Sequence, residues 1–188
     1  LIAAWMIKRL SSEIERRNRI ESELEQRVHE RTEKLRYTAN HDSLTSLPNR
    51  SMFTGQMELA IERAKRNKTR CALFFMDRDG FKEINDGYGH EFGDQVLVEV
   101  SAVLKNLIRS EDAIARLGGD EFTILITDLK QNSDAKDIAN KIINAVGQPI
   151  KCKGNIVCLV GISIGIAYFP DDAIETDLLL TRADDFMY

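Results

Sequence analysis

The sequence predicts an α/β domain, with a mixed central sheet flanked by helices, that follows one long N-terminal helix. Three observations lead to this prediction. Residues 8–39 contain no proline or glycine and are densely charged, as in a solvated helix. Cys71–Met76 is an uninterrupted apolar run of strand length, which indicates a strand buried on both faces. Beyond Asn40, helical and strand patterns alternate, which is typical of a layered α/β fold.

Apolar side chains recur in a heptad pattern along the N-terminal helix, which we treat as a unit of residues 1–39. The a positions are Ile7, Ile14, Glu21, Val28 and Leu35, and the d positions are Leu10, Arg17, Leu24, Arg31 and Thr38. Six of these ten positions are apolar, which predicts a weakly packed parallel coiled coil. Such a marginal seam suits a signalling helix whose register shifts with small inputs. A solvated monomeric helix is the alternative.

The first residues, Leu1–Ile7, are apolar and are followed by Lys8 and Arg9. They are too short to cross a bilayer, which takes about 20 residues. We expect them to be the cytoplasmic end of a membrane helix, with Trp5 at the interface and the basic residues inside. The parent protein is then anchored in the inner membrane. The alternative is the first turns of a soluble helix.

Each later element has its own local signal. Leu47–Arg50 is a turn that opens a helix over about Ser51–Lys65, with its apolar residues on one face. Two glycines between the apolar segments Ala113–Leu117 and Phe122–Ile126 predict a β-hairpin. The remaining predicted elements are helices at Phe81–Asn85, Asp94–Arg109 and Ser133–Val146, strands at Ile156–Val160 and Ile162–Tyr168, and a last helix from near Thr176.

Acidic residues stand where two of these strands end. Asp77 follows the buried strand, while Asp120 and Glu121 follow the hairpin glycines. Oxygen ligands from one or two carboxylates, completed by substrate phosphates, are what Mg²⁺ usually takes. We therefore expect Asp77 and Asp120 to share one metal site if their strands are neighbours. Ordinary acids in solvated turns are the alternative for each residue alone.

Five separated motifs together resemble the GGDEF domain, the diguanylate cyclase family, over about residues 40–188. They are His41–Arg50, Asp77–Asp86, Gly89–Asp94, Arg116–Phe122 and Ser163–Ala167. The resemblance implies the palm-like fold of nucleotidyl cyclases and polymerases. It also implies conversion of two GTP into cyclic di-GMP and two pyrophosphates. That reaction needs Mg²⁺ or Mn²⁺ and a homodimer in which each subunit brings one GTP.

The resemblance assigns the metal site to the carboxylates of Asp77 and Asp120 and to the backbone carbonyl of Arg78. Either Asp120 or Glu121 helps to deprotonate the ribose 3′-hydroxyl, and the sequence does not separate their roles. Gly118 and Gly119 let the hairpin backbone lie against the α-phosphate, although a hairpin turn without a ligand explains the same glycines.

Substrate contacts follow from the same resemblance. Phe81 and Lys82 open a short helix whose free N–H groups suit the β- and γ-phosphates, although Lys82 can equally be a solvated surface residue. Asn85 and Asp94 match the guanine readers, because guanine presents two adjacent donors that a carboxylate accepts. Asp94 can also be read as the N-cap of the following helix. His90 matches a substrate-contacting position.

Arg109 and Asp112 match the inhibitory product site of the family, where guanidinium and carboxylate bind cyclic di-GMP. A surface Arg–Asp pair is the alternative. Two departures from the family pattern stand out. Ser46 occupies a position where the family usually has glycine, in a loop that we expect to be tolerant. The Lys and Arg that clamp the β- and γ-phosphates follow the Ala183–Tyr188 element in the family, so we expect them to be missing here.

Composition narrows the class of function. A formal net charge of −4 argues mildly against general nucleic-acid binding. The three cysteines lack metal-ligand spacing, Cys71 and Cys158 lie in apolar runs, and a reducing cytoplasm fits them. The leading hypothesis is an active diguanylate cyclase module. Its rivals are a catalytically silent GGDEF module that regulates an attached phosphodiesterase domain, and a purely structural dimerisation module.

Overall fold

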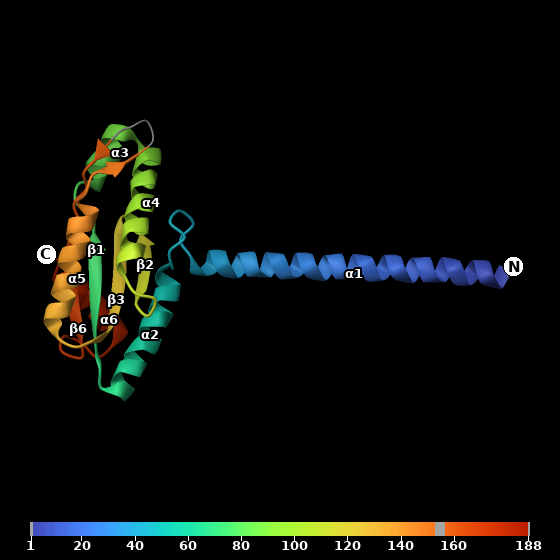
Figure 1. Ribbon diagram of the computed structural model, residues 1–188, viewed down its shortest axis with the longest axis horizontal. Coiled ribbons are helices and arrows are strands. Elements are labelled where there is room, and N and C mark those ends of the chain that lie inside the picture. The colour runs from blue at the N-terminus through green and yellow to red at the C-terminus, as the bar shows by residue number, and fades with distance from the viewer. Residues whose placement is uncertain (1, 153–156, 188) are drawn as a thin grey trace. The chain divides into compact units, whose positions relative to one another are not determined.

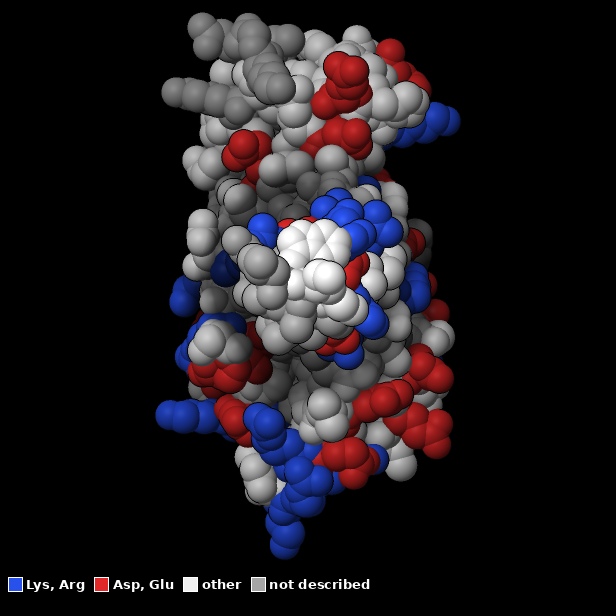
Figure 2. Space-filling view, turned by 90° about the vertical axis from the view of Figure 1, so that its right-hand side faces the viewer, with Lys and Arg blue, Asp and Glu red and all other residues white. Residues whose placement is uncertain are grey.

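The computed structural model describes residues 2–152 and 157–187 (Figure 1). The chain divides into two units, residues 1–39 and residues 40–188, which we describe separately. On the face shown in Figure 2, basic and acidic side chains are interspersed. This mixture agrees with the small net charge of the sequence.

The N-terminal unit is a single helix, α1 (Ile2–Asn40). Among its predicted seam residues, Leu24, Val28 and Leu35 are 60%, 56% and 69% exposed in the isolated chain. An apolar stripe of this kind gains stability only when another surface covers it. Within residues 2–152 and 157–187, no helix is long and apolar enough to span a membrane.

The second unit is built on a four-stranded sheet with the strand order β2-β3-β1-β6. Its strands are β1 (Arg70–Asp77), β2 (Ala113–Gly118), β3 (Glu121–Leu129) and β6 (Ser163–Phe169). The α/β fold class with a sheet flanked by helices is confirmed. We expected a mixed sheet, and the three described ladders are all antiparallel. The central strand β1 lies between β3 and β6, and both of these strands are antiparallel to it.

Helices cover both faces of this sheet, so β1 is buried on each side as its sequence predicted. Phe74 and Met76 pack with α4 (His90–Leu107) and α5 (Asn132–Val146) in one core cluster. Leu73 and Phe75 pack with α2 (Arg50–Asn67) and α6 (Thr176–Asp185) in the other. Because successive strand side chains alternate between faces, one continuous apolar run supplies both cores.

The helix limits confirm some predictions and correct others. Helix α2 begins beside the N-cap Asn49, whose side chain accepts a hydrogen bond from the Met52 N–H at 3.0 Å. Helix α4 begins at His90, and its N-cap is Gly89 rather than Asp94. The N-cap interpretation of Asp94 is therefore wrong. The helix extends further because Phe92, in its first turn, is buried in the core.

The limits of three other elements also differ from the predicted ones. Helix α3 (Phe81–Tyr88) is longer than predicted, and α4 ends before Arg109, which lies in the turn that follows. The strand predicted over Ile156–Val160 is limited, within the described residues, to β5 (Val157–Cys158), and Ile156 lies outside them. Strand β5 pairs with β4 (Ile150–Lys151) in a separate two-stranded sheet.

Candidate active site

The turn between β2 and β3 leaves its backbone accessible. Gly118 and Gly119 have φ values of +150° and +53°, a region that glycine adopts without steric cost. A Cβ added at either position would meet no atom within 4 Å. The turn thus combines a backbone conformation that favours glycine with open space in front of it, as the approach of a ligand requires.

Arg116 fixes this turn from the inside. Its Nε and Nη2 donate to the Gly119 carbonyl at 3.0 and 2.7 Å, and its Nη1 donates to Asp42 Oδ1 at 2.8 Å. The Arg116 N–H also donates to the Pro48 carbonyl at 3.0 Å. The side chains of Arg116 and Asp42 are only 11% and 20% exposed. The hairpin of β2 and β3 is therefore tied to the loop that precedes α2.

Asp42 organises that loop as well. It accepts hydrogen bonds from the Thr45 N–H at 2.8 Å and from the Thr45 hydroxyl at 2.6 Å. Burial raises the pKa of Asp42, but the hydrogen bonds from Thr45 and Arg116 outweigh it, so the pKa is lowered overall. Ser46 takes a φ of +57° in the same loop. Glycine adopts this backbone conformation without steric cost, which explains why it is usual at this position in the family that the sequence resembles. Sequence reasoning assigned no role to Asp42 or Arg116, although both lie inside recognisable motifs.

Three carboxylates gather where β1 and the hairpin end. Burial raises the pKa of Asp77, and the charge of Asp120 raises it further. Burial also raises the pKa of Glu121, with a smaller effect from the charges of Asp77 and Asp120. The register supports this proximity, because Met76 of β1 lies opposite Phe122 of β3. Carboxylates that repel one another in this way are stabilised when a cation binds between them.

Asp120 and Glu121 have different surroundings. Glu121 Oε2 lies 3.7 Å from Nη2 of Arg50, the first residue of α2. Asp120 lies in the turn itself, after Gly119. Arg50 lowers the pKa of Glu121 but does not cancel the effect of burial. The two neighbouring acids are therefore available for separate tasks.

The donor set fits a divalent cation that is completed by a ligand. Asp77 and Asp120 offer carboxylate oxygens, and the Arg78 carbonyl follows directly in the chain. In the described part of the chain, no group of three or more His, Cys, Asp or Glu side chains is arranged to hold a metal ion. Mg²⁺ rarely uses an all-protein cage and usually takes one or two carboxylates plus substrate phosphates. The arrangement corresponds to that mode.

Arg78 is an unusual neighbour for these acids. Its side chain is 3% exposed, and Nε, Nη1 and Nη2 have no hydrogen-bond partner among the described residues. Its guanidinium carbon lies 4.2 Å from the centroid of the Phe81 ring. Burial lowers the pKa of Arg78 to about 10, so the group remains charged at neutral pH. Sequence reasoning used only the backbone carbonyl of this residue.

Apart from Gly118 and Gly119, the predicted substrate-binding residues lie on α3 and α4, which pack against each other. Phe81 and Lys82 begin α3, after Gly80 at φ +73°. The Asn85 Oδ1 atom is buried and has no partner among the described residues. A Cβ at Gly93 would clash with that atom and would lie 3.1 Å from the Phe81 ring. Gly93 therefore permits the close approach that brings Asn85 beside α4.

Two further predicted residues lie on α4 itself. His90 is its first residue and is exposed. Asp94 follows Gly93 and so lies next to the contact with Asn85. Asn85, whose amide oxygen has no partner among the described residues, and Asp94 thus lie on two helices that pack against each other.

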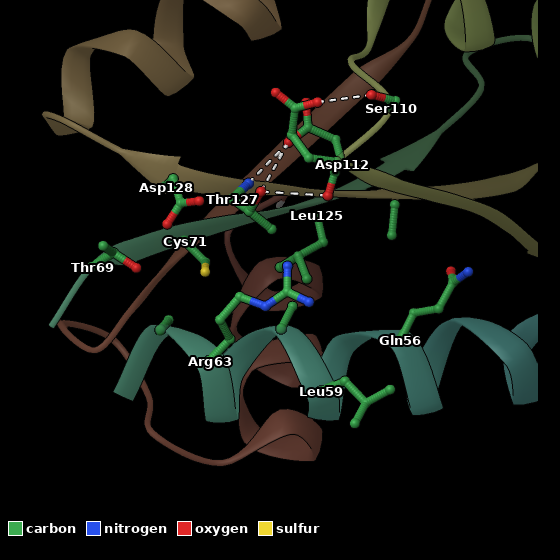
Figure 3. A pocket seen from close by; sticks show the side chains of 14 residues that line it. Gln56, Leu59, Arg63, Thr69, Cys71, Ser110, Asp112, Leu125, Thr127 and Asp128 are labelled. Atoms are coloured by element: carbon green, nitrogen blue, oxygen red, sulfur yellow. Dashed lines mark hydrogen bonds between the residues drawn. The ribbon is translucent and has the colours of Figure 1, made fainter. Parts of the chain in front are cut away.

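The residues predicted to bind product are separated from this site along the sheet. Asp112 Oδ2 accepts from the Arg109 N–H at 3.3 Å, and its Oδ1 accepts from the Thr127 N–H at 3.0 Å. Asp112 also lines a cavity of about 230 Å³ between α2 and the strands. Figure 3 shows Arg63 extending from α2 into this cavity. Arg109 is not among the residues that line it.

Comparison with known proteins identifies the relatives of this chain. The family described as "Diguanylate cyclase, GGDEF domain" matches residues 39–188. Diguanylate cyclase TpbB of Pseudomonas aeruginosa is 41% identical over 162 residues, which are 86% of this chain and 37% of that protein. The bifunctional diguanylate cyclase/cyclic di-GMP phosphodiesterase MucR of the same species is 43% identical over 150 residues, which are 80% of this chain and 22% of that protein.

A solved structure extends the likeness to the N-terminal helix. The coiled coil and GGDEF domain of DgcB from Caulobacter crescentus, in complex with c-di-GMP, matches with a TM-score of 0.81 at 28% identity. The match covers 93% of this chain and 92% of that one. The chain spans little more than a third of the length of TpbB, and less of MucR.

Proposed function

Because the chain belongs to the GGDEF family of diguanylate cyclases, we propose that residues 40–188 catalyse the condensation of two GTP into cyclic di-GMP and two pyrophosphates. The observation that carries this proposal is the acid cluster of Asp77, Asp120 and Glu121 beside a glycine turn held by Arg116. A purely structural module has no need for repelling carboxylates at an accessible turn. Their retention therefore supports catalysis.

Asp77, Asp120 and the Arg78 carbonyl would hold Mg²⁺ or Mn²⁺. When bound, the metal neutralises phosphate charge and lowers the pKa of the attacking 3′-hydroxyl. Asp120 and Glu121 are the two carboxylates available to accept the hydroxyl proton. Arg116 keeps the turn in one conformation, so that the Gly118–Gly119 backbone meets the α-phosphate without a further ordering cost.

Guanine selection is assigned to Asn85 and Asp94. The unpaired Asn85 Oδ1 and the Asp94 carboxylate accept hydrogen bonds, and guanine N1–H and N2–H₂ donate them. Adenine carries a lone pair at N1 and would leave these acceptors unsatisfied. The first N–H groups of α3, at Phe81 and Lys82, face the β- and γ-phosphates in this proposal. His90 is a further substrate contact.

Assembly and control are proposed to involve both units. Each module holds one GTP, so completion of the ring needs a second module opposite the first. The exposed apolar stripe of α1, with Leu24, Val28 and Leu35, would supply part of the dimer interface as a coiled coil. Cyclic di-GMP bound at Arg109 and Asp112 would inhibit the dimer. The module lies on the cytoplasmic side of an inner-membrane protein in this proposal.

A silent GGDEF module that binds GTP or cyclic di-GMP is the second candidate. It is favoured by one comparison, because the relative NbdA of Pseudomonas aeruginosa, 33% identical over 181 residues, is named only as a cyclic di-GMP phosphodiesterase. In that case the module would regulate an attached phosphodiesterase domain. The two candidates differ in turnover of GTP, which only the first predicts.

The decisive experiment is Asp120→Asn in the full-length protein. Cyclic di-GMP formation from GTP and Mg²⁺, measured by chromatography, should be abolished while the circular dichroism spectrum is unchanged. Asp137→Asn removes an exposed charge from α5 and is the matched control. Turnover retained in Asp120→Asn would refute its catalytic role. Absence of turnover in the unsubstituted protein, with GTP still bound, would favour the silent module.

A further inference from the structure

Three arginines surround the acid cluster, and only one of them lacks an anionic partner among the described residues. Arg50 pairs with Glu121 at 3.7 Å, and Arg116 pairs with Asp42 at 2.8 Å. Arg78 forms no such pair in the described part of the chain, and its three guanidinium nitrogens are all buried and unpaired. Its charge is therefore not cancelled by contact.

The charge of Arg78 acts on the acids of the proposed metal site. The charged group that acts on it most strongly is Asp120, and Asp77 also contributes. Cys158 and the cationic Arg116 are the other titratable neighbours. The Phe81 ring covers the guanidinium at 4.2 Å, so little water screens it. A charge in such surroundings acts over a longer distance than a solvated one.

We propose that Arg78 is a positioning residue whose buried charge, without an ion pair among the described residues, makes the metal site favour a cation carried by nucleotide phosphates over the free cation. This inference rests on the proposed metal site of Asp77 and Asp120. The two carboxylates attract a free divalent cation, whereas Arg78 repels it. A metal–triphosphate complex carries net negative charge, so Arg78 attracts it while the carboxylates repel its phosphates. Arg78 thus shifts the preference of the site toward metal and nucleotide arriving together.

Packing of Arg78 on Phe81 offers a purely structural explanation of the same contacts. The two explanations predict different changes in binding affinity when the Arg78 side chain is replaced. Loss of a packing role would weaken the binding of free cation and of metal–nucleotide complex alike. Loss of a positioning charge would strengthen the first and weaken the second.

The experiment compares Arg78→Met, which is neutral and of similar length, with Arg78→Lys, which keeps the charge. Arg66→Met removes an exposed charge at the end of α2 and is the control. All three substitutions preserve the backbone carbonyl. Free Mn²⁺ is titrated without nucleotide by electron paramagnetic resonance. The Mn²⁺ complex of a GTP analogue with an unreactive α,β-methylene bridge is then titrated by calorimetry, with circular dichroism as the check on folding.

Arg78→Met should bind free Mn²⁺ roughly tenfold more tightly and the Mn²⁺–nucleotide complex roughly tenfold more weakly. Arg78→Lys should lie near the unsubstituted protein in both titrations, and Arg66→Met should change neither. Changes in the same direction, or no change in Arg78→Met, would overturn the inference while leaving the proposed function intact. If the unsubstituted protein binds neither Mn²⁺ nor the complex, the proposed metal site itself fails and the inference falls with it.

Discussion

Substitution of Asp42 by asparagine should destabilise the domain although residue 42 lies outside the acid cluster. Asp42 Oδ1 accepts hydrogen bonds from the Thr45 N–H, the Thr45 hydroxyl and Arg116 Nη1 at 2.8, 2.6 and 2.8 Å. Asparagine keeps an acceptor oxygen for Thr45 but loses the charge that faces Arg116. The substitution therefore isolates the electrostatic part of the interaction.

The size of the effect follows from burial. The Asp42 and Arg116 side chains are 20% and 11% exposed, so solvent screens the pair weakly. A hydrogen bond to a charged group contributes about 1.5–3 kcal/mol and a neutral one about 0.5–1.5 kcal/mol. Replacement of the first by the second should lower the free energy of unfolding by about 1–2 kcal/mol.

Urea unfolding followed by circular dichroism measures this difference. The control is Glu33→Gln, which neutralises an ion pair with Arg36 whose side chains are 56% and 73% exposed. Such a surface pair should contribute less than about 0.5 kcal/mol. If Asp42→Asn costs no more than Glu33→Gln, the argument from burial is refuted.

The pH dependence provides a second check on the same residue. The pKa of Asp42 is lowered in the folded state from its ordinary value of 3.8. Its contribution is therefore fully present above that ordinary value and is lost as the pH falls through the lowered pKa. The stability difference between the unsubstituted protein and the Asp42→Asn variant should shrink in this acidic window. A difference that persists unchanged at lower pH would contradict the assignment.

Three further predictions concern other parts of the chain. Gly165→Ala should lower the free energy of unfolding by about 2 kcal/mol or more, because its Cβ would lie close to the Ala183 carbonyl oxygen of α6. Gly55→Ala in α2, with no atom within 4 Å of its Cβ, should raise the free energy of unfolding by about 0.5–1 kcal/mol. The reverse order of stability in urea unfolding would contradict both predictions. Arg109→Ala should weaken cyclic di-GMP binding by about 1.5–3 kcal/mol with little effect on GTP, and equal calorimetric affinities would leave Arg109 as a surface residue. Removal of residues 1–38 should reduce self-association in analytical ultracentrifugation and lower activity, and no change in either would rule out the coiled-coil interface.

The sequence by itself determined the elements whose signals are local. An apolar residue at every position of Cys71–Met76 is needed only in a strand covered on both faces, and β1 is buried in that way. The pair Gly118–Gly119 between two apolar segments specified the hairpin, because few other residues adopt the backbone conformation of its turn. The five motifs also placed the chain in its family, since their order along the chain is independent of any contact.

Only the tertiary structure decided the features that depend on residues distant in the chain. Asp42 and Arg116 are 74 positions apart, so no local pattern announces that they meet. Packing of Phe92 moved the start of α4 ahead of Asp94. Sequence analysis assigned a role only to the backbone carbonyl of Arg78, and burial of its guanidinium without a partner among the described residues became apparent only in the folded chain. The burial of a side chain and the pairing of its charge depend on the tertiary structure, because the same side chain is exposed to solvent or buried according to the residues that pack around it.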